Sequence, residues 1–499
     1  MAILTDTLIV GAGFSGIGTA IALRDAGFDD FLIVDDADGP GGVWHWNTYP
    51  SVAVDIPSFS YQFSFEQESD WSRSYAPGRE LKAYAEHCVD KYRLASQMQF
   101  STRVQSATYD EEAATWQVET SRGPITARTL VHAGGPLSQP KSPDIPGLDS
   151  FAGVTMHTSR WDHSVDLAGK RVGIIGTGAT AVQVIPEIAP ITGHLTVFQR
   201  TPIWCLPKLD VALPRPLRSA MRLPGVKGAL RLASQAYVEV TFPIAAHFHK
   251  RVPVAGVAAA SARKYMASQV RDPRTREKLL PTYALGCKRP SFHNSYLSTF
   301  NRDDVALVTD SIEEITAEGI RTVDGTVHEL DVLILATGFK VTDKDALPSY
   351  TVLGPGGVDL ADHWEATRFH SYQGVSTVGF PNIFAVFGPY GYNGASFFTL
   401  VENSAAHIVR VLREARRRGT PVIEVTETAQ EEYMSGVLAR KDGQVFADPS
   451  CGGANSYYFT ANGDVPFRAS TTIEASWTNR RFPLEHYKFT DAGTVIQAT

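Results

Sequence analysis

Cysteine is scarce in this 499-residue sequence, and its four copies, Cys88, Cys205, Cys287 and Cys451, lie far apart. The sequence contains no Cys-x-x-Cys pair, which excludes that type of redox centre, and its cysteines lack the spacing of a zinc site. They also form no dense disulfide framework. We therefore expect reduced cysteines, no bound metal and a cytoplasmic protein.

An excess of basic residues is also missing, because 46 Lys and Arg stand against 53 Asp and Glu, a formal net charge of -7. Nucleic-acid-binding proteins tend to be strongly basic, so we expect small-molecule partners and no nucleic acid. Long hydrophobic runs are absent too, since none reaches the roughly 18 residues of a membrane span. The first residues resemble a strand instead of a signal peptide, which predicts no stable membrane insertion. Nothing in the pattern indicates an oligomeric state.

Residues 7–35 have the pattern of a strand, a glycine-rich turn, a helix and a second strand. Gly11, Gly13 and Gly16 form G-x-G-x-x-G, in which the glycines allow a tight turn, a close approach to a pyrophosphate and helix packing. The helix N-terminus then faces the anion. Asp35 ends the second strand, where a carboxylate accepts hydrogen bonds from a ribose diol. This unit predicts a dinucleotide site, and a chance glycine-rich turn is the alternative.

Residues 170–201 repeat this design, with Gly176, Gly178 and Ala181 as G-x-G-x-x-A. The second strand of this unit ends at Arg200 instead of an acid. A guanidinium can bind a 2′-phosphate through two hydrogen bonds, whereas a carboxylate would repel it. We therefore expect this unit to bind NADPH; a solvated surface arginine is the alternative.

Two dinucleotide units in one chain, one ending in an acid and one in a base, suggest tightly held FAD beside exchangeable NADPH. The predicted fold is α/β, with two Rossmann-like dinucleotide-binding domains and a helical insertion. Disulfide reductases share this plan but need an adjacent cysteine pair, which the sequence lacks. What remains is a flavoprotein that transfers electrons to dioxygen or directly to an organic acceptor.

The segment between the two units points to one of these chemistries. Phe151, Gly153, His157, Trp161 and Asp162 match F-x-G-x-x-x-H-x-x-x-W-[P/D], which resembles the fingerprint of type I Baeyer–Villiger monooxygenases. The sister flavin-containing monooxygenases usually lack the Trp-Pro or Trp-Asp ending. Histidine titrates near neutral pH, but this segment joins two domains, so we expect His157 and Trp161 to fix the linker; direct catalysis is the alternative.

Other segments resemble the same family in the same order. GGVWHWNTYPSVAVD, residues 41–55, is similar to its second motif, and LSQPKSPDIPG, VFQRTP, GCKRP and ATGF are also family-like. Two positions depart from the pattern. Ser51 stands where Gly or Met is usual beside the flavin, and Tyr457 stands where several members carry a Trp that touches the nicotinamide.

The resemblance implies an enzyme that uses NADPH and dioxygen to insert one oxygen atom beside a ketone carbonyl, giving an ester or lactone through a C4a-peroxyflavin. It implies that Arg289 stabilises this anionic peroxide and then the oxyanion of the ketone adduct. Asp55 would accept hydrogen bonds from Arg289 and orient it. The structural alternatives are an ordinary ion pair for Arg289 and a turn-forming role for Asp55.

The resemblance and the glycine turns together provide the candidate cofactor-binding residues. Lys288 is expected to contact the NADPH phosphate beside Arg200, with a solvated lysine as the alternative. The candidates for FAD are Gly11, Gly13, Phe14, Ser15, Gly16, Asp35, Gly42, Val43, Trp44, Tyr61 and Val104, and those for NADPH are Gly176, Thr177, Gly178, Thr180, Arg200, Thr201 and Lys288.

Three units are expected: an FAD-binding domain at 1–140 and 342–499, an NADPH-binding domain at 141–209 and 292–341, and a helical subdomain at 210–291. Within the last, residues 214–235 carry five basic residues and no acidic one. A solvated helix face is the expected account, with a mouth for lipophilic substrates or contact with anionic lipid as alternatives.

Three further functions stay open from the sequence. An S- or N-oxygenating monooxygenase would use the same cofactors but needs a protonated hydroperoxyflavin as electrophile. A peroxide-releasing NADPH oxidase would also use both nucleotide units, and a flavin-binding protein without turnover would need only the first.

Overall fold

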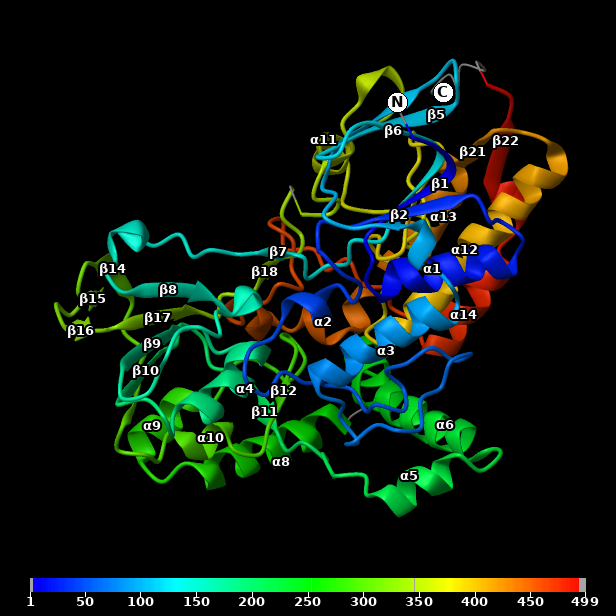
Figure 1. The fold of residues 1–499 in the computed structure, drawn as a ribbon. Helices are drawn as coiled ribbons and strands as arrows, with labels where there is room; N and C mark the ends of the chain where they lie inside the picture. Colours follow the sequence, from blue (N-terminus) through cyan, green and yellow to red (C-terminus); the bar gives the residue numbers. More distant parts are fainter. Residues whose placement is uncertain (1–2, 253, 345, 493–499) are drawn as a thin grey trace.

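The computed structural model describes residues 3–252, 254–344 and 346–492. One lobe, on the right in Figure 1, is centred on an eight-stranded sheet with the order β19-β4-β5-β6-β1-β2-β3, in which β20 also pairs with β6. Its strands are β1 (Ile3–Val10), β2 (Phe31–Val34), β3 (Met98–Gln99), β4 (Val104–Asp110), β5 (Thr115–Thr120), β6 (Ile125–His132), β19 (Thr351–Leu353) and β20 (Ile383–Ala385).

The first glycine-rich turn lies at the carboxyl end of β1. That strand runs parallel to β2 and β6. Its residues Leu8 and Ile9 are fully buried, as expected for a strand covered on both faces. The helix α1 (Phe14–Asp25) follows the turn and packs against the long helix α12 (Phe397–Arg418). This packing fixes the N-terminus of α1 at the edge of the sheet.

The second lobe, on the left in Figure 1, is built on a wholly parallel sheet with the order β13-β10-β9-β17-β8. Its strands are β8 (Val154–His157), β9 (Arg171–Ile175), β10 (His194–Phe198), β13 (Val305–Val308) and β17 (Val332–Leu335). The helix α4 (Ala179–Ile188) connects β9 to β10. The predicted α/β fold with two Rossmann-like domains and a helical insertion is therefore confirmed.

Two short strand pairs mark where the chain changes lobe. β7 (Gln139–Pro140) and β18 (Phe339–Lys340) pair antiparallel where the chain passes between the two large sheets. β11 (Cys205–Leu206) and β12 (Ser291–Phe292) pair in parallel and bracket the helical insertion.

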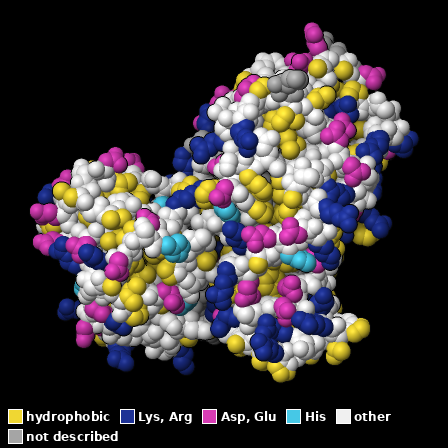
Figure 2. Space-filling view, in the orientation of Figure 1, with side chains coloured by type: hydrophobic (Ala, Val, Ile, Leu, Met, Phe, Trp, Pro, Cys, Tyr) yellow, Lys and Arg dark blue, Asp and Glu magenta, His cyan; other side chains and the backbone are white. Residues whose placement is uncertain are grey.

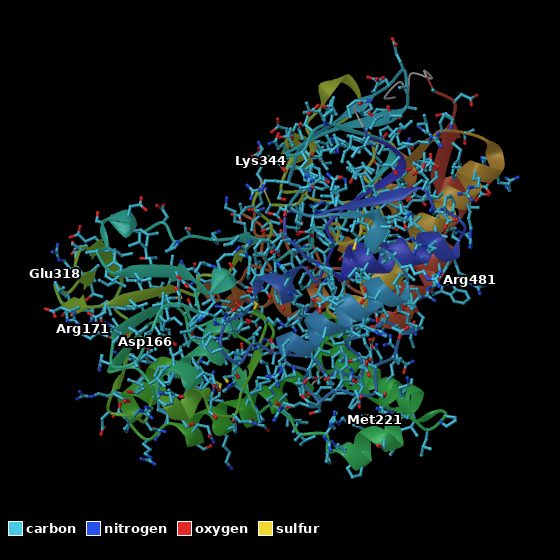
Figure 3. All side chains as sticks on the ribbon, viewed as in Figure 1. Asp166, Arg171, Met221, Glu318, Lys344 and Arg481 are labelled. Carbon is cyan, nitrogen blue, oxygen red and sulfur yellow. A yellow bond between two sulfur atoms is a disulfide. The ribbon has the colours of Figure 1, made fainter. Side chains whose placement is uncertain are left out.

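The insertion contains α5 (Arg215–Met221), α6 (Val226–Glu239), α7 (Ala245–His247), α8 (Val254–Gln269) and α9 (Pro273–Leu279). Met221 of α5, labelled in Figure 3, and Val238 of α6 join the core of the first lobe, whereas Met266 and Leu279 join that of the second. In the described part of the chain, no hydrophobic cluster consists of insertion residues alone. The insertion therefore packs against both lobes.

The remaining elements complete these lobes. They are α2 (Val43–Trp46), α3 (Gly78–Lys91), α10 (Tyr296–Thr299), α11 (Leu360–Ala366), α13 (Glu427–Leu438), α14 (Thr472–Arg481), the sheet β14 (Ile312–Thr316), β15 (Gly319–Thr322) and β16 (Val327–Glu329), and the pair β21 (Val422–Val425) and β22 (Tyr487–Thr490).

Two of the four cysteines are bonded to each other. Cys287 and Cys451 form a disulfide across 164 residues of sequence, while Cys88 and Cys205 are free and buried. The expectation of four reduced cysteines is therefore wrong for this pair. Only the tertiary fold brings the loop before Lys288 next to the segment before Tyr457, so spacing along the sequence could not reveal the bond.

None of the helices within the described ranges combines the length and apolar character that crossing a membrane requires. Over the same ranges, no three or more His, Cys, Asp or Glu side chains gather as a set of metal ligands.

Candidate active site

The turn after β1 has a backbone that only glycine can supply. Gly11 has a φ of +116°, and a Cβ atom there would lie 2.6 Å from the backbone oxygen of Ala133. A Cβ atom on Gly16 would lie 1.9 Å from the backbone oxygen of Gly11, so Gly16 sets the contact of α1 with the strand. The N–H groups of the first turn of α1 are left facing the cavity, as a pyrophosphate requires.

Asp35 lies directly after β2 and beside this turn. Its two carboxylate oxygens accept hydrogen bonds from the backbone N–H groups of Ala12, at 2.5 Å, and Ala37, at 2.9 Å. Burial raises the pKa of Asp35, and these two N–H donors oppose that shift. The carboxylate is thus held rigidly at the position where a ribose would lie.

Most of the residues predicted to bind FAD line one cavity at this turn. They are Gly11, Gly13, Phe14, Ser15, Asp35, Gly42, Val43, Trp44 and Tyr61. The indole N–H of Trp44 donates to the hydroxyl of Tyr61 at 3.3 Å. Gly16 and Val104 are not among the lining residues; Gly16 packs α1 on β1, and Val104 begins β4. The glycine turn, the free helix N-terminus and the fixed carboxylate together fit FAD.

The residues predicted for NADPH line a second and larger cleft. Gly176 has a φ of +114°, and a Cβ atom there would lie 2.4 Å from the backbone oxygen of Ala336, which repeats the arrangement at the first turn. The cleft is lined by all of the predicted positions, namely Gly176, Thr177, Gly178, Thr180, Arg200, Thr201 and Lys288. The hydroxyl of Thr177 donates to the backbone oxygen of Thr201 at 2.9 Å, which ties the glycine turn to the end of β10.

Two cations meet in this cleft. Burial, together with the neighbouring charge of Arg200, lowers the pKa of Lys288 to about 8. Within the described residues, neither cation forms an ion pair with a carboxylate. Two uncompensated cations side by side are the arrangement that a dianionic phosphate satisfies, so the cleft fits the 2′-phosphate of NADPH.

Arg289 lies where the two cavities meet. Among the described residues, it is the one charged side chain that lines both of them. Burial lowers the pKa of Arg289, but the neighbouring Tyr458, Tyr392 and Tyr457 and the carboxylate of Asp55 raise it more. The guanidinium therefore stays protonated.

Asp55 lies in the first cavity and is held by a residue that the sequence analysis missed. The amide of Gln183 donates to Asp55 Oδ1 at 3.5 Å and to the backbone oxygen of Ala53 at 3.1 Å, and it accepts from the N–H of Ala53 at 3.0 Å. Gln183 is a buried polar residue in the otherwise apolar ATAVQVI run of α4, which is the one sequence signal that could have found it.

In the described part of the chain, no hydrogen bond or ion pair joins the side chains of Arg289 and Asp55. The predicted hydrogen bond between them is therefore not observed there. Burial raises the pKa of Asp55, while the charges of Arg289 and then Lys208, and the hydrogen bond from Gln183, lower it. Arg289 acts on Asp55 through charge, and its guanidinium also interacts with the hydroxyls of Tyr392 and Tyr458. Lys208 is a second cation that the sequence did not indicate.

Both departures from the family pattern lie at these cavities or beside them. Ser51 adopts a φ of +63°, a left-handed backbone that glycine adopts at lower cost, so the turn is kept although the glycine is not. Tyr457 lines both cavities. It is 42% exposed.

The fingerprint segment lies outside both cavities. The imidazole Nδ1 of His157 accepts from the N–H of Ser159 at 3.1 Å and lies 2.8 Å from its hydroxyl. Next along the chain, the guanidinium of Arg160 stacks 3.7 Å from the ring centroid of Trp46 in the first lobe. His157 and Trp161 line neither cavity in the described structure. These contacts favour a linker role for the fingerprint.

Comparison with known proteins agrees with this geometry. The profile described as pyridine nucleotide-disulphide oxidoreductase matches residues 8–213, which include both glycine turns. A Baeyer–Villiger monooxygenase of Streptomyces coelicolor is 35% identical over 488 residues, which cover 96% of this chain and 92% of that protein. A phenazine N-monooxygenase of Lysobacter antibioticus is also 35% identical, covering 86% of each chain. The crystal structure of OTEMO in complex with FAD and NADP superposes with a TM-score of 0.86 at 28% identity, over 98% of this chain and 100% of that one.

The fold and the site define a flavoprotein monooxygenase with one site for FAD and one for NADPH. More narrowly, the chain belongs to the Baeyer–Villiger monooxygenase family. The predicted cofactors, FAD and NADPH, and the predicted enzyme class are confirmed.

Proposed function

We propose that Arg289 and Asp55 form the catalytic centre for oxygen insertion beside a ketone carbonyl. The observation that carries this proposal is that Arg289 is the charged side chain common to the two cofactor cavities in the described chain. FAD, when bound, would supply the transfer of electrons from NADPH to dioxygen. The guanidinium of Arg289 would donate hydrogen bonds to the carbonyl oxygen of the ketone as this oxygen gains negative charge.

Asp55 would act by holding Arg289 in place. A buried carboxylate beside two buried cations balances part of their charge and attracts the guanidinium toward one side of the cavity. Gln183 fixes the backbone of Ala53 and the carboxylate of Asp55 together. The pair would therefore present Arg289 to the substrate in one orientation, which is what preorganised electrostatic catalysis needs.

Arg200 and Lys288 would bind the 2′-phosphate of NADPH, while the glycine turn before α4 receives its pyrophosphate. We propose that Arg200 and this glycine turn belong to an NADPH-binding domain at 141–209 and 292–341. The FAD-binding domain would comprise 1–140 and 342–499, of which residues 1–2, 345 and 493–499 lie outside the described structure. Residues 210–291, which include Lys288 and of which 253 is not described, would form the helical unit between them.

A second candidate is oxygenation of a nitrogen or sulfur atom with the same cofactors. The similarity to a phenazine N-monooxygenase favours keeping it. In that reaction the substrate is the nucleophile, so a negative charge does not build up on a substrate oxygen beside Arg289. Loss of Arg289 would then affect the reaction on ketones more than that on amines.

Incubation with NADPH and isotopically labelled dioxygen over a panel of ketones, sulfides and amines tests both candidates. We expect one labelled oxygen atom in an ester or lactone. If the labelled oxygen appears only in a sulfoxide or a hydroxylamine, the protein oxygenates sulfur or nitrogen and the ketone hypothesis is wrong. NADPH consumption that yields hydrogen peroxide without labelled product would indicate an oxidase, and no consumption would indicate a flavin-binding protein without turnover.

The partners proposed here are a small-molecule ketone and dioxygen. We also propose a cytoplasmic location, because NADPH is supplied inside the cell. Cell fractionation checks this, with recovery of the protein outside the cytoplasmic membrane as the contrary result.

A further inference from the structure

The helix α6 has its charged side chains on the side that faces the protein. Lys227 Nζ donates to the backbone oxygen of Gln67 at 2.7 Å, and Arg231 Nη1 donates to that of Gln62 at 2.8 Å. At the end of the helix, the carboxylate of Glu239 accepts from the N–H of Thr472 at 3.0 Å. These three are all the charged residues of α6, so each of its charged side chains is hydrogen-bonded to another part of the protein.

The opposite side of α6 is exposed and apolar. Leu232 is 73% exposed and Tyr237 is 37% exposed, and Val240, the first residue of the π-helix Val240–Ile244 that continues α6, is 55% exposed. The exposed side chains are Ala229, Leu232, Ala233, Ala236, Tyr237 and Val240, whose spacing of three and four residues places them on one helix face. A single exposed leucine is ordinary, but a continuous apolar face is a mark of an interaction surface.

The neighbouring helix α5 extends this face. Leu217 is 46% exposed and Leu223, in the turn between the two helices, is 60% exposed. The helix itself is firmly attached, since Met221 is buried in the core of the first lobe (Figure 3). In Figure 2, hydrophobic atoms lie beside Lys and Arg side chains over the lower right of the molecule, where Figure 1 places α5 and α6.

Residues 214–235 carry five basic residues and no acidic one in a protein whose formal net charge is -7. Arg218 and Arg222 contact Asp70 at 3.8 and 3.0 Å, but within the described chain Arg215 forms no ion pair. These three arginines therefore share one paired carboxylate, which leaves an excess of positive charge beside the apolar face. An apolar face bordered by excess positive charge is complementary to anionic headgroups above an apolar interior.

We propose that this α5–α6 surface, formed by the exposed apolar residues from Leu217 to Val240 and the arginines Arg215, Arg218 and Arg222, docks on a lipid bilayer with anionic headgroups. The helix would lie in the plane of the headgroup boundary without crossing the bilayer. A second copy of the chain is the weaker occupant, because a two-fold interface places the same patch against itself and would bring arginines against arginines.

Vesicle flotation with the purified holoenzyme tests this proposal without any turnover. One set of vesicles contains phosphatidylcholine alone, and the other contains equal amounts of phosphatidylcholine and phosphatidylglycerol. We expect the protein to float with the anionic set at low salt, and to be released as sodium chloride screens the arginines.

Two variants separate the apolar and the charged parts of the surface. Leu232→Glu should reduce flotation at least about tenfold, because a charge then enters the apolar face. Arg215→Glu should reduce it about fivefold or more, since each basic residue near an anionic surface contributes about that factor. Val323→Glu is the matched control, because Val323 is 63% exposed in the turn after β15 and belongs to the second lobe, outside the proposed surface.

All three variants should keep the FAD absorbance spectrum of the original protein, which verifies folding. The proposal is overturned if the protein does not float with anionic vesicles, or if Val323→Glu weakens flotation as much as Leu232→Glu. It is also overturned if sedimentation without lipid reveals a dimer that Leu232→Glu dissociates, because the face then belongs to a second copy.

Discussion

The side-chain amide of Gln183 lies 3.5 Å from the carboxylate of Asp55, which is 128 residues away in the sequence. Gln183 is part of α4, the helix whose N-terminus we propose as the binding site for the NADPH pyrophosphate, whereas Asp55 lines the first cavity. One polar side chain therefore connects the helix of the nucleotide cleft to the carboxylate beside Arg289.

The first prediction concerns this connection. Gln183→Leu removes a hydrogen bond to a charged group, which contributes about 1.5–3 kcal/mol, so we expect at least about a tenfold loss of product formed per NADPH consumed. The KM for NADPH and the FAD content should change little, because Gln183 does not line the glycine turn. Product and peroxide yields measured beside NADPH consumption check this. Unchanged coupling would show that Gln183 only packs the interface.

The second prediction concerns Arg289. Arg289→Ala should retain FAD and still accept hydride from NADPH, but it should form ester about 10²–10³-fold more slowly, as expected for loss of an oxyanion donor. Stopped-flow reduction of the flavin and product analysis measure the two steps separately. Arg289→Lys keeps the charge but loses the planar set of donors, so only partial recovery is expected. Full activity of Arg289→Ala would eliminate it as the catalytic cation.

The third prediction concerns the choice of nucleotide. Arg200→Ala should raise the KM for NADPH at least about tenfold, because a charged hydrogen-bond partner of the 2′-phosphate is lost, while the KM for NADH stays the same. Arg171→Ala is the matched control. Arg171, labelled in Figure 3, is paired with Glu329 and Asp331 in the same lobe and lies outside the cleft. An unchanged nucleotide preference in Arg200→Ala would show that the 2′-phosphate binds at another site.

The fourth prediction is a pH dependence that arises from Lys288. Burial lowers the pKa of Lys288 to about 8, so the side chain is cationic below that pH and neutral above it. A bound phosphate favours the cation, and affinity for NADPH is therefore present at lower pH and is lost as pH rises through 8. We expect the KM for NADPH to rise above pH 8. The range below about pH 6 is avoided, because the 2′-phosphate itself takes up a proton there.

Lys288→Arg supplies the comparison for this profile, since a guanidinium stays charged throughout the range. Its KM for NADPH should not rise between pH 7 and 9. A rise as steep as that of the original protein would assign the pH dependence to another group.

The fifth prediction concerns the disulfide. Reduction of the Cys287–Cys451 bond should lower the free energy of unfolding by about 2–4 kcal/mol, the usual contribution of a bond that closes a long loop. Thermal unfolding with and without dithiothreitol measures the effect. The double variant Cys287→Ser, Cys451→Ser should already be less stable and should not respond to the reductant. An equal response in both proteins would show that the reductant acts elsewhere.

Much of the cofactor chemistry could be predicted because it depends on short segments. The G-x-G-x-x-G turn, the helix after it and Asp35 are contained in fewer than thirty residues, and the close contact that requires Gly16 is made with Gly11 of the same turn. The identity of Arg200 at the equivalent place in the second unit is enough to indicate NADPH. Arg289 and Asp55 were found through resemblance to a family, since no local pattern distinguishes them from other charged residues.

The geometry of the site depends on contacts between distant segments. Gln183 and Lys208 both act on Asp55, but neither lies near it in the sequence, so only the packing of the two lobes brings them together. The disulfide could not be predicted from the sequence for the same reason. Ser51 was recognised as unusual in the sequence, but its left-handed φ became evident only from the backbone.

The sequence by itself determined the two nucleotide units, their cofactors and the enzyme class, because glycine turns and strand ends are local features. For residues 214–235 it predicted a solvated helix face with five basic residues. Only the tertiary structure decided which face of α6 points outward, because periodicity defines the faces of a helix but not the surface against which it packs. The polar side chains of α6 found partners in backbone oxygens of the first lobe, and this packing left Leu232 and its neighbours on the outside.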